Sequence, residues 1–133
     1  MEIKFRKFKV GESEILMGKD SKQNDELVKQ FKGEKNKIIH TVAPGSPFCV
    51  INDLKPSAIT IYLSGAYCAA YSQDWRDNKK NTKINIFTGK DVNKTFGMKT
   101  GTWKVKNSKT RIIKKEDILK IKKNGKNRTS PTR

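Results

Sequence analysis

Alternating apolar and charged residues mark the beginning of the chain. In the stretch IKFRKFKV (3–10), Ile3 and Phe5 fall on one face of an extended strand, and Phe8 and Val10 fall on the other. We expect a bulge between the two pairs. After a turn at the next three residues, the apolar run 14–18 is expected to pair back as the second strand of a hairpin.

Helical spacing begins directly after this hairpin. Asp20 stands three residues before Gln23, which is the arrangement of a capping box, and an apolar stripe then recurs every three or four residues until Gly33 ends the helix. A longer helix is expected over 58–76, where apolar residues recur at the same spacing and Ser57 can cap the first turn.

The other apolar segments are short and fit strands. Segments 37–42 and 48–51 flank the turn APGSP and predict an antiparallel pair. Segment 83–89 predicts a further strand, and 100–107 with 109–114 predict another hairpin. Segment 115–123 fits either a strand or a helix. The fold class that follows is α+β: a mostly antiparallel sheet with two main helices packed on one face.

The length of 133 residues fits one domain. We place this domain at 1–121. The last segment, 122–133, has no apolar periodicity and is expected to be a disordered basic tail. Such a tail can add non-specific phosphate affinity or simply be solvated.

The charge of the chain indicates which class of partner it binds. The chain has 30 Lys and Arg against 13 Asp and Glu, a formal net charge of +17. This imbalance favours a polyanionic partner, with nucleic acid before an anionic membrane surface. A generally lysine-rich composition is the alternative explanation. No apolar run approaches the length of a membrane span, and no signal peptide begins the chain, so a cytoplasmic location without membrane contact is expected.

Candidate chemistry for catalysis is sparse. Two cysteines, Cys49 and Cys68, lie in apolar runs and are expected to be buried thiols; with one histidine, His40, they form no metal-ligand spacing. Ser46 is not in a nucleophile elbow, and no phosphate-binding loop is present. We therefore expect no enzymatic activity, no metal and no cofactor. An enzyme acting on nucleic acid around His40 and Asp25 is kept as a minor alternative.

Phosphate binding has two candidate sites. The first is the start of the helix after Asp20, where free backbone N–H groups lie beside Lys19, and where the cap leaves Asn24 and Asp25 unexplained. The second is the glycine-containing loop 87–101, which carries three lysines that can face a phosphate backbone. Phe96 and Trp103 are candidate stacking platforms for bases, but packing into the core is the favoured interpretation for both.

Four motifs follow one another along most of the chain. They are Gly18-Lys19-Asp20 with Asn24-Asp25 and Leu27; His40 with Pro44-Gly45-Ser46; an alanine-rich helix that ends in Tyr71-Ser72; and Phe87-Thr88 with Lys90, Val92, Lys94, Gly97 and Gly101. In this order and at these intervals, they resemble the RNA-binding domain of NFACT proteins (NFACT-R), the ribosome quality-control factors of RqcH/NEMF type. The resemblance runs from about Glu12 to Ile121.

This resemblance implies a stand-alone RNA-binding module whose partner is tRNA or rRNA, associated with the ribosome in quality control or translation. The chain departs from the family pattern at Ile38, where a tryptophan is usual, and at Pro47, where a histidine is usual. The residues expected to contact nucleic acid are Lys19, Asn24, Asp25, His40, Ser46, Thr88, Lys90, Lys94 and Lys99. Two alternatives stay open: a protein-interaction module that docks on a ribosomal or quality-control partner, and general DNA binding.

Overall fold

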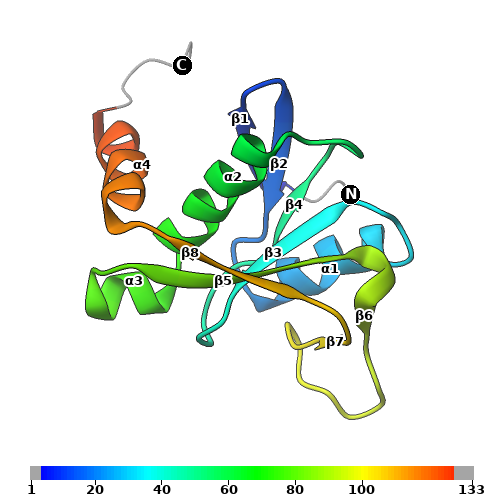
Figure 1. Cartoon of the computed structure of the whole chain (residues 1–133). Coiled ribbons are helices and arrows are strands. Elements are labelled where there is room, and N and C mark those ends of the chain that lie inside the picture. The colour runs from blue at the N-terminus through cyan, green and yellow to red at the C-terminus, as the bar shows by residue number, and fades with distance from the viewer. Residues whose placement is uncertain (1–3, 128–133) are drawn as a thin grey trace.

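The structure is a computed structural model that describes residues 4–127 of the chain. Its elements alternate between short strands and helices (Figure 1). They are β1 (Arg6–Val10), β2 (Ser13–Met17), α1 (Ser21–Phe31), β3 (Lys37–Thr41), β4 (Cys49–Ile51), α2 (Ala58–Ala70), α3 (Gln73–Asn78), β5 (Thr82–Thr88), the 3-10 turn η1 (Gly89–Asp91), β6 (Val92–Asn93), β7 (Lys104–Val105), β8 (Lys109–Ile113) and α4 (Lys115–Asn127).

Six strands form one sheet in the order β1-β2-β4-β3-β5-β8, and every neighbouring pair is antiparallel. The predicted α+β class is confirmed. The hairpin of β1 and β2 and the antiparallel pairing of β3 with β4 are confirmed as well. β1 and β2 pair residue for residue from Arg6 to Val10, so the expected bulge does not interrupt this ladder.

Both predicted helix caps are present. The carboxylate of Asp20 accepts a hydrogen bond from the Gln23 N–H at 2.8 Å, and the hydroxyl of Ser57 accepts one from the Thr60 N–H at 3.2 Å. The expected helix 58–76 is, however, two helices. Ser72 begins the second, because its hydroxyl accepts a hydrogen bond from the Trp75 N–H at 3.1 Å and thereby caps α3.

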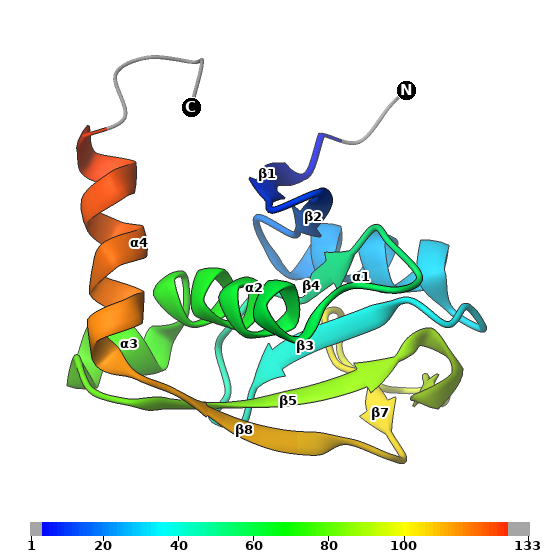
Figure 2. The same cartoon turned by 45° about the horizontal axis from the view of Figure 1, so that its top comes forward.

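The two main helices lie on opposite faces of the sheet, and the expectation that they share one face is wrong. Side chains alternate along each strand: Ile39 packs in the core that contains α2, and its neighbour Ile38 packs in the core that contains α1. The central strands are buried on both faces, which is why β4 is apolar at every position. Figure 2 shows α2 along the sheet and α4 standing at its end.

The C-terminal part of the chain differs from the predicted pattern in two places. β7 pairs with β6 in a separate two-stranded sheet, and β8 pairs with β5, so the expected hairpin of 100–107 with 109–114 does not form. Segment 115–123 is helical, and α4 continues to Asn127. Residues 122–127, which we expected to begin the disordered tail, therefore belong to this helix; the rest of the tail lies outside the described residues.

Both cysteines are buried and free, as predicted. Burial raises the pKa of the Cys68 thiol to about 12 and also raises the pKa of Cys49, so neither is a reactive thiolate near neutral pH. No helix in the described part of the chain is long and apolar enough to cross a membrane.

Candidate nucleic-acid interface

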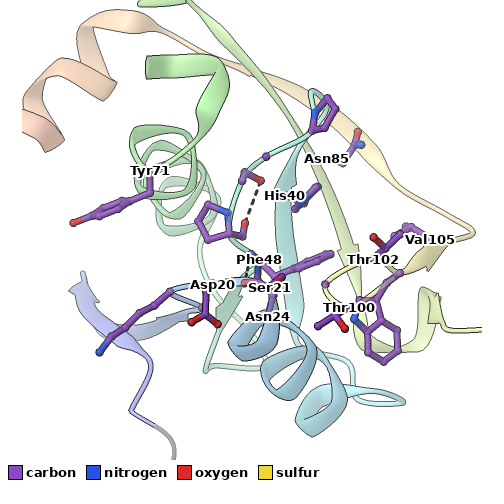
Figure 3. Close-up of a pocket in the computed structure, with 18 of the residues that line it drawn as sticks. Asp20, Ser21, Asn24, His40, Phe48, Tyr71, Asn85, Thr100, Thr102 and Val105 are labelled. Atoms are coloured by element: carbon purple, nitrogen blue, oxygen red, sulfur yellow. Dashed lines mark hydrogen bonds between the residues drawn. The ribbon is translucent and has the colours of Figure 1, made fainter. Parts of the chain in front are cut away.

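A cleft of about 590 Å³ opens on the α1 face of the sheet. Its walls come from the end of β2 and the start of α1, the turn between β3 and β4, the middle of β5, and the segment that leads into β7. Figure 3 shows Tyr71 on one side, the labelled residues Thr100, Thr102 and Val105 on the other, and His40 with Phe48 between them. Of the nine predicted contact residues, the cleft brings together Lys19, Asn24, His40 and Ser46.

Asn24 is a structural residue at the edge of this cleft. Its buried side-chain oxygen accepts a hydrogen bond from the Phe48 N–H at 3.1 Å, which ties α1 to the start of β4. Gly18 donates its N–H to the Phe48 carbonyl at 3.3 Å, and a Cβ on Gly18 would overlap the Asn24 side-chain oxygen. Gly18 and Asn24 therefore act together: the glycine leaves the room that the asparagine needs to hold the strand.

Asp25 and Lys94 bind each other. One Asp25 oxygen accepts hydrogen bonds from the Lys94 ammonium at 2.8 Å, the Gly101 N–H at 2.8 Å and the Trp103 indole N–H at 3.0 Å. The Lys94 ammonium also donates to the carbonyls of Lys99 and Thr102, both at 3.0 Å. This cluster fixes segment 94–103 against α1, so neither charge is free for a phosphate.

The electrostatics of Asp25 follow from these contacts. Partial burial acts to raise the pKa of the carboxyl, but the hydrogen bond and charge of Lys94, together with the hydrogen bonds from Gly101 and Trp103, outweigh it and lower the pKa below the ordinary value of 3.8. Asp25 is therefore ionised at neutral pH, as the anchoring role requires.

His40 lies on the floor of the cleft, opposite in direction to Ile39 as predicted. Its ring stacks on Phe48 with centroids 4.4 Å apart and planes 23° apart. Burial lowers its pKa below the ordinary value of 6.5, against hydrogen bonds at Thr41 and Ser46 that act to raise it. His40 is therefore a neutral ring at pH 7 and adds an aromatic face rather than a charge.

Ser46 holds the turn between β3 and β4. Its hydroxyl accepts a hydrogen bond from the Thr41 N–H at 3.0 Å and donates to the Pro47 carbonyl at 3.2 Å. The preceding Gly45 has a φ of +91°, and its carbonyl accepts a hydrogen bond from the Gln73 N–H at 2.8 Å. The motif Pro-Gly-Ser thus docks the turn on the start of α3.

Thr88 ends β5 and Lys90 belongs to η1, near the C-terminal end of α1, and neither residue lines the cleft. The Thr88 hydroxyl accepts a hydrogen bond from the Lys90 N–H at 3.2 Å and donates to the Asp91 carboxylate at 3.0 Å. Thr88 is thus the cap of η1, while the exposed side chain of Lys90 faces solvent. Lys99 is also exposed, in the segment that Lys94 anchors.

Three cations line the cleft: Arg6, Lys19 and Arg76. None of them is in an ion pair within residues 4–127, and the nearby Asp20 carboxylate already caps α1. Sequence reasoning missed Arg6 and Arg76 because they sit on β1 and α3, two elements that are far apart in the sequence.

The two candidate stacking platforms, Trp103 and Phe96, differ in burial. Trp103 is partly buried and packs against the α1 core, as favoured. Phe96 is fully exposed, and its predicted place in the core is wrong. It stands before Gly97 (φ +89°) in a turn closed by the hydrogen bond from the Met98 N–H to the Thr95 carbonyl at 3.2 Å. Among the described residues, no group of His, Cys, Asp and Glu could hold a metal ion.

Comparison with known families identifies this arrangement. Residues 4–107 match the sequence pattern of the NFACT protein RNA binding domain, which is well over half of the chain. The chain belongs to this family. NFACT-R membership makes it an RNA-binding module, and it confirms the resemblance drawn from the four motifs.

A solved structure shares the fold of this NFACT-R chain. It is the C-terminal part of the fibronectin/fibrinogen-binding protein from Streptococcus suis, at a TM-score of 0.78 and 23% sequence identity. The match covers 91% of this chain and 49% of that one, so this chain spans about half the length of the matched structure. No curated protein matches the sequence.

Proposed function

We propose that this NFACT-R chain binds structured RNA, such as tRNA or rRNA at the ribosome in the cytoplasm, through phosphate contacts around the cleft. The observation that carries the proposal is the set of three cations, Arg6, Lys19 and Arg76, that line one cleft without a carboxylate partner in the described residues. In a chain of net charge +17, such cations can neutralise phosphates and release their counterions.

Two of the three cations are held in position. The guanidinium carbon of Arg6 lies 4.8 Å from the centroid of the Tyr71 ring, and Arg76 donates to the Gln73 side chain at 2.9 Å. Ordering these side chains in advance reduces the entropy lost when RNA binds. Lys90 and Lys99, exposed beyond the cleft, extend the basic surface. The contacts position RNA by its backbone, with little reading of base sequence.

A role in ribosome quality control or translation is the cellular context that we propose for this binding, and it rests on the family alone. The proposal does not extend to C-terminal tailing of stalled chains, because that activity is associated with other regions of full NFACT proteins. The proposal includes no catalytic step, and we assign the ring of His40, which stacks on Phe48, to the floor of the binding cleft.

One observation favours docking of a protein as a second function. Val42 and Ile112 are 48% and 52% exposed and lie on the same face of the sheet, on either side of Lys83. With Lys83 between them they form a small mixed patch, and neither Val42 nor Ile112 lines the cleft. A protein partner at this patch and RNA at the cleft are compatible with each other.

The salt dependence of tRNA binding tests the proposal. With about five phosphates contacted, the logarithm of the association constant is expected to fall with the logarithm of salt concentration at a slope of roughly −3.5 to −4.5. Duplex DNA of equal length serves as competitor, and we expect it to displace tRNA only weakly. No binding at low salt, or a flat salt response, would contradict phosphate-driven RNA binding; equal competition by DNA would favour general nucleic-acid binding.

A further inference from the structure

The cleft carries more ring surface than phosphate contacts require. His40 stacks on Phe48, and Phe87 meets Phe48 edge to face, with centroids 6.3 Å apart and planes 83° apart. Trp103 lies on the side of the β7 segment, and its indole N–H is held by Asp25 at 3.0 Å. Phe48 and Phe87 are buried and support the floor from below, so the partly exposed rings of His40 and Trp103 are the ones that can meet a flat, unsaturated ligand group.

A hydrogen-bonding group stands beside this wall. Asn85 on β5 pairs directly with His40 on β3, so the two side chains lie on the same face of the sheet. The Asn85 side-chain oxygen accepts a hydrogen bond from the Thr110 hydroxyl at 3.1 Å, which fixes the amide. Its amide nitrogen makes no hydrogen bond within the described residues and remains available as a donor to a ligand in the cleft.

The cations lie on the other side of the cleft, around Tyr71. Arg6 is held over the Tyr71 ring, and Arg76 donates to the Tyr71 carbonyl at 3.5 Å. Figure 3 shows Tyr71 separated from Thr100 and Val105 by the floor residues His40 and Phe48. The cleft is therefore divided into an aromatic part with a hydrogen-bond donor and a cationic part.

We propose that the cleft binds a single unpaired nucleotide of the RNA, with its base against His40 and Trp103 and its phosphate at Arg6 and Arg76. The volume of about 590 Å³ lies in the range of pockets that enclose a small ligand. Unstacked bases in RNA bulges, loops and ends are the groups that proteins bind on aromatic rings. This inference rests on the proposed RNA binding and adds that the RNA must contain an unpaired nucleotide.

The test compares two hairpin RNAs that differ by one nucleotide. The first has a fully paired stem, and the second carries one unpaired nucleotide bulged from that stem. Binding of the full chain is measured by fluorescence anisotropy at one salt concentration. We expect the bulged RNA to bind about 5- to 150-fold more tightly, the range that stacking of one base supplies. Equal affinities would overturn the nucleotide cleft while leaving RNA binding intact, and no binding of either RNA would overturn both.

Single-residue variants test whether the cleft causes the preference for the bulged RNA. Asn85→Ala and His40→Leu are each expected to bring the ratio of bulged to paired affinity close to one, with little effect on the paired RNA. Asn52→Ala is the matched control, because it makes the same change at an exposed asparagine that does not line the cleft, and it is expected to keep the wild-type ratio. Circular dichroism and thermal unfolding confirm that each variant is folded. An unchanged ratio in both cleft variants, or an equal fall in the control, would overturn the proposal.

A competition experiment tests the chemical class of the occupant. A phosphorylated aromatic side chain of a protein has a ring and an anion as well. We expect adenosine monophosphate to displace the bulged RNA at lower concentration than phosphotyrosine does. Displacement by phosphotyrosine at the lower concentration would contradict the assignment of the cleft to a nucleotide.

Discussion

One oxygen of Asp25 lies 2.8 Å from the ammonium of Lys94, and this contact joins α1 to a segment 69 positions further along the chain. Both residues are motif positions that we expected to contact RNA. Each instead satisfies the other, within a cluster that includes Gly101 and Trp103. Their place in the family pattern is therefore explained by the construction of one wall of the cleft.

Replacement of Asp25 by alanine is expected to destabilise the fold by about 1–3 kcal/mol, because it removes the carboxylate partner of Lys94 and leaves the N–H groups of Gly101 and Trp103 without their acceptor. The matched control is Glu26→Ala. This removes the exposed pair with Lys29 at 3.7 Å, for which less than about 0.5 kcal/mol is expected. Urea unfolding measures both. Similar losses in the two variants would show that the Asp25 cluster is not an anchor.

Alanine variants at two glycines of segment 94–103 distinguish the cost of backbone strain from the cost of a steric overlap. Gly101 and Gly97 have φ values of +84° and +89°, so alanine at either position is expected to cost about 1–2 kcal/mol in backbone strain. A Cβ at Gly101 would also lie 2.7 Å from the Cβ of Ser21, whereas one at Gly97 would meet nothing within 4 Å. We expect Gly101→Ala to lose about 1 kcal/mol more in thermal or urea unfolding. A larger loss in Gly97→Ala would contradict the packing of this segment on α1.

The burial of His40 predicts a pH dependence of stability. The unfolded chain binds a proton at His40 near pH 6.5, but the folded chain resists it because burial lowers the pKa. The free energy of unfolding is therefore expected to fall as the pH decreases from 7.5 to 5.5, by at most about 1.4 kcal/mol per pH unit below pH 6.5. His40→Leu is expected to remove this fall. Parallel pH profiles for the two proteins would contradict the buried, neutral histidine.

Local signals in the sequence predicted much of the sheet and both main helix starts. Asp20 and Ser57 cap the helices as expected, because capping depends on residues only three positions apart. Sequence reasoning failed where distant contacts decide. Segment 94–103, which joins β6 to β7, is held against α1 by hydrogen bonds to Asp25, and β7 pairs with β6. No local pattern in the sequence predicts this contact.

The candidate site shows the same division. The motifs located the floor and the α1 edge of the cleft, with His40, Ser46, Asn24 and Lys19. They could not show that Asn24 and Ser46 hold backbone N–H groups, since their partners Phe48 and Thr41 are known only from the fold. Arg6 and Arg76 escaped notice because a single basic residue on a strand or a short helix carries no sequence signal in so basic a chain.

The cleft cations give the most direct test of the central claim. The triple variant Arg6→Gln, Lys19→Gln, Arg76→Gln is compared with Lys32→Gln, Lys55→Gln, Lys80→Gln, three exposed lysines that do not line the cleft. Both variants lose the same charge, and tRNA binding is measured over a series of salt concentrations.

We expect the cleft variant to bind more weakly at every salt concentration and its salt slope to become shallower by about 2–3, since each lost phosphate contact lowers the slope by about 1. The control variant is expected to keep nearly the wild-type slope. Equal losses in the two variants would show that RNA binding follows total charge and would contradict the cleft as the RNA site.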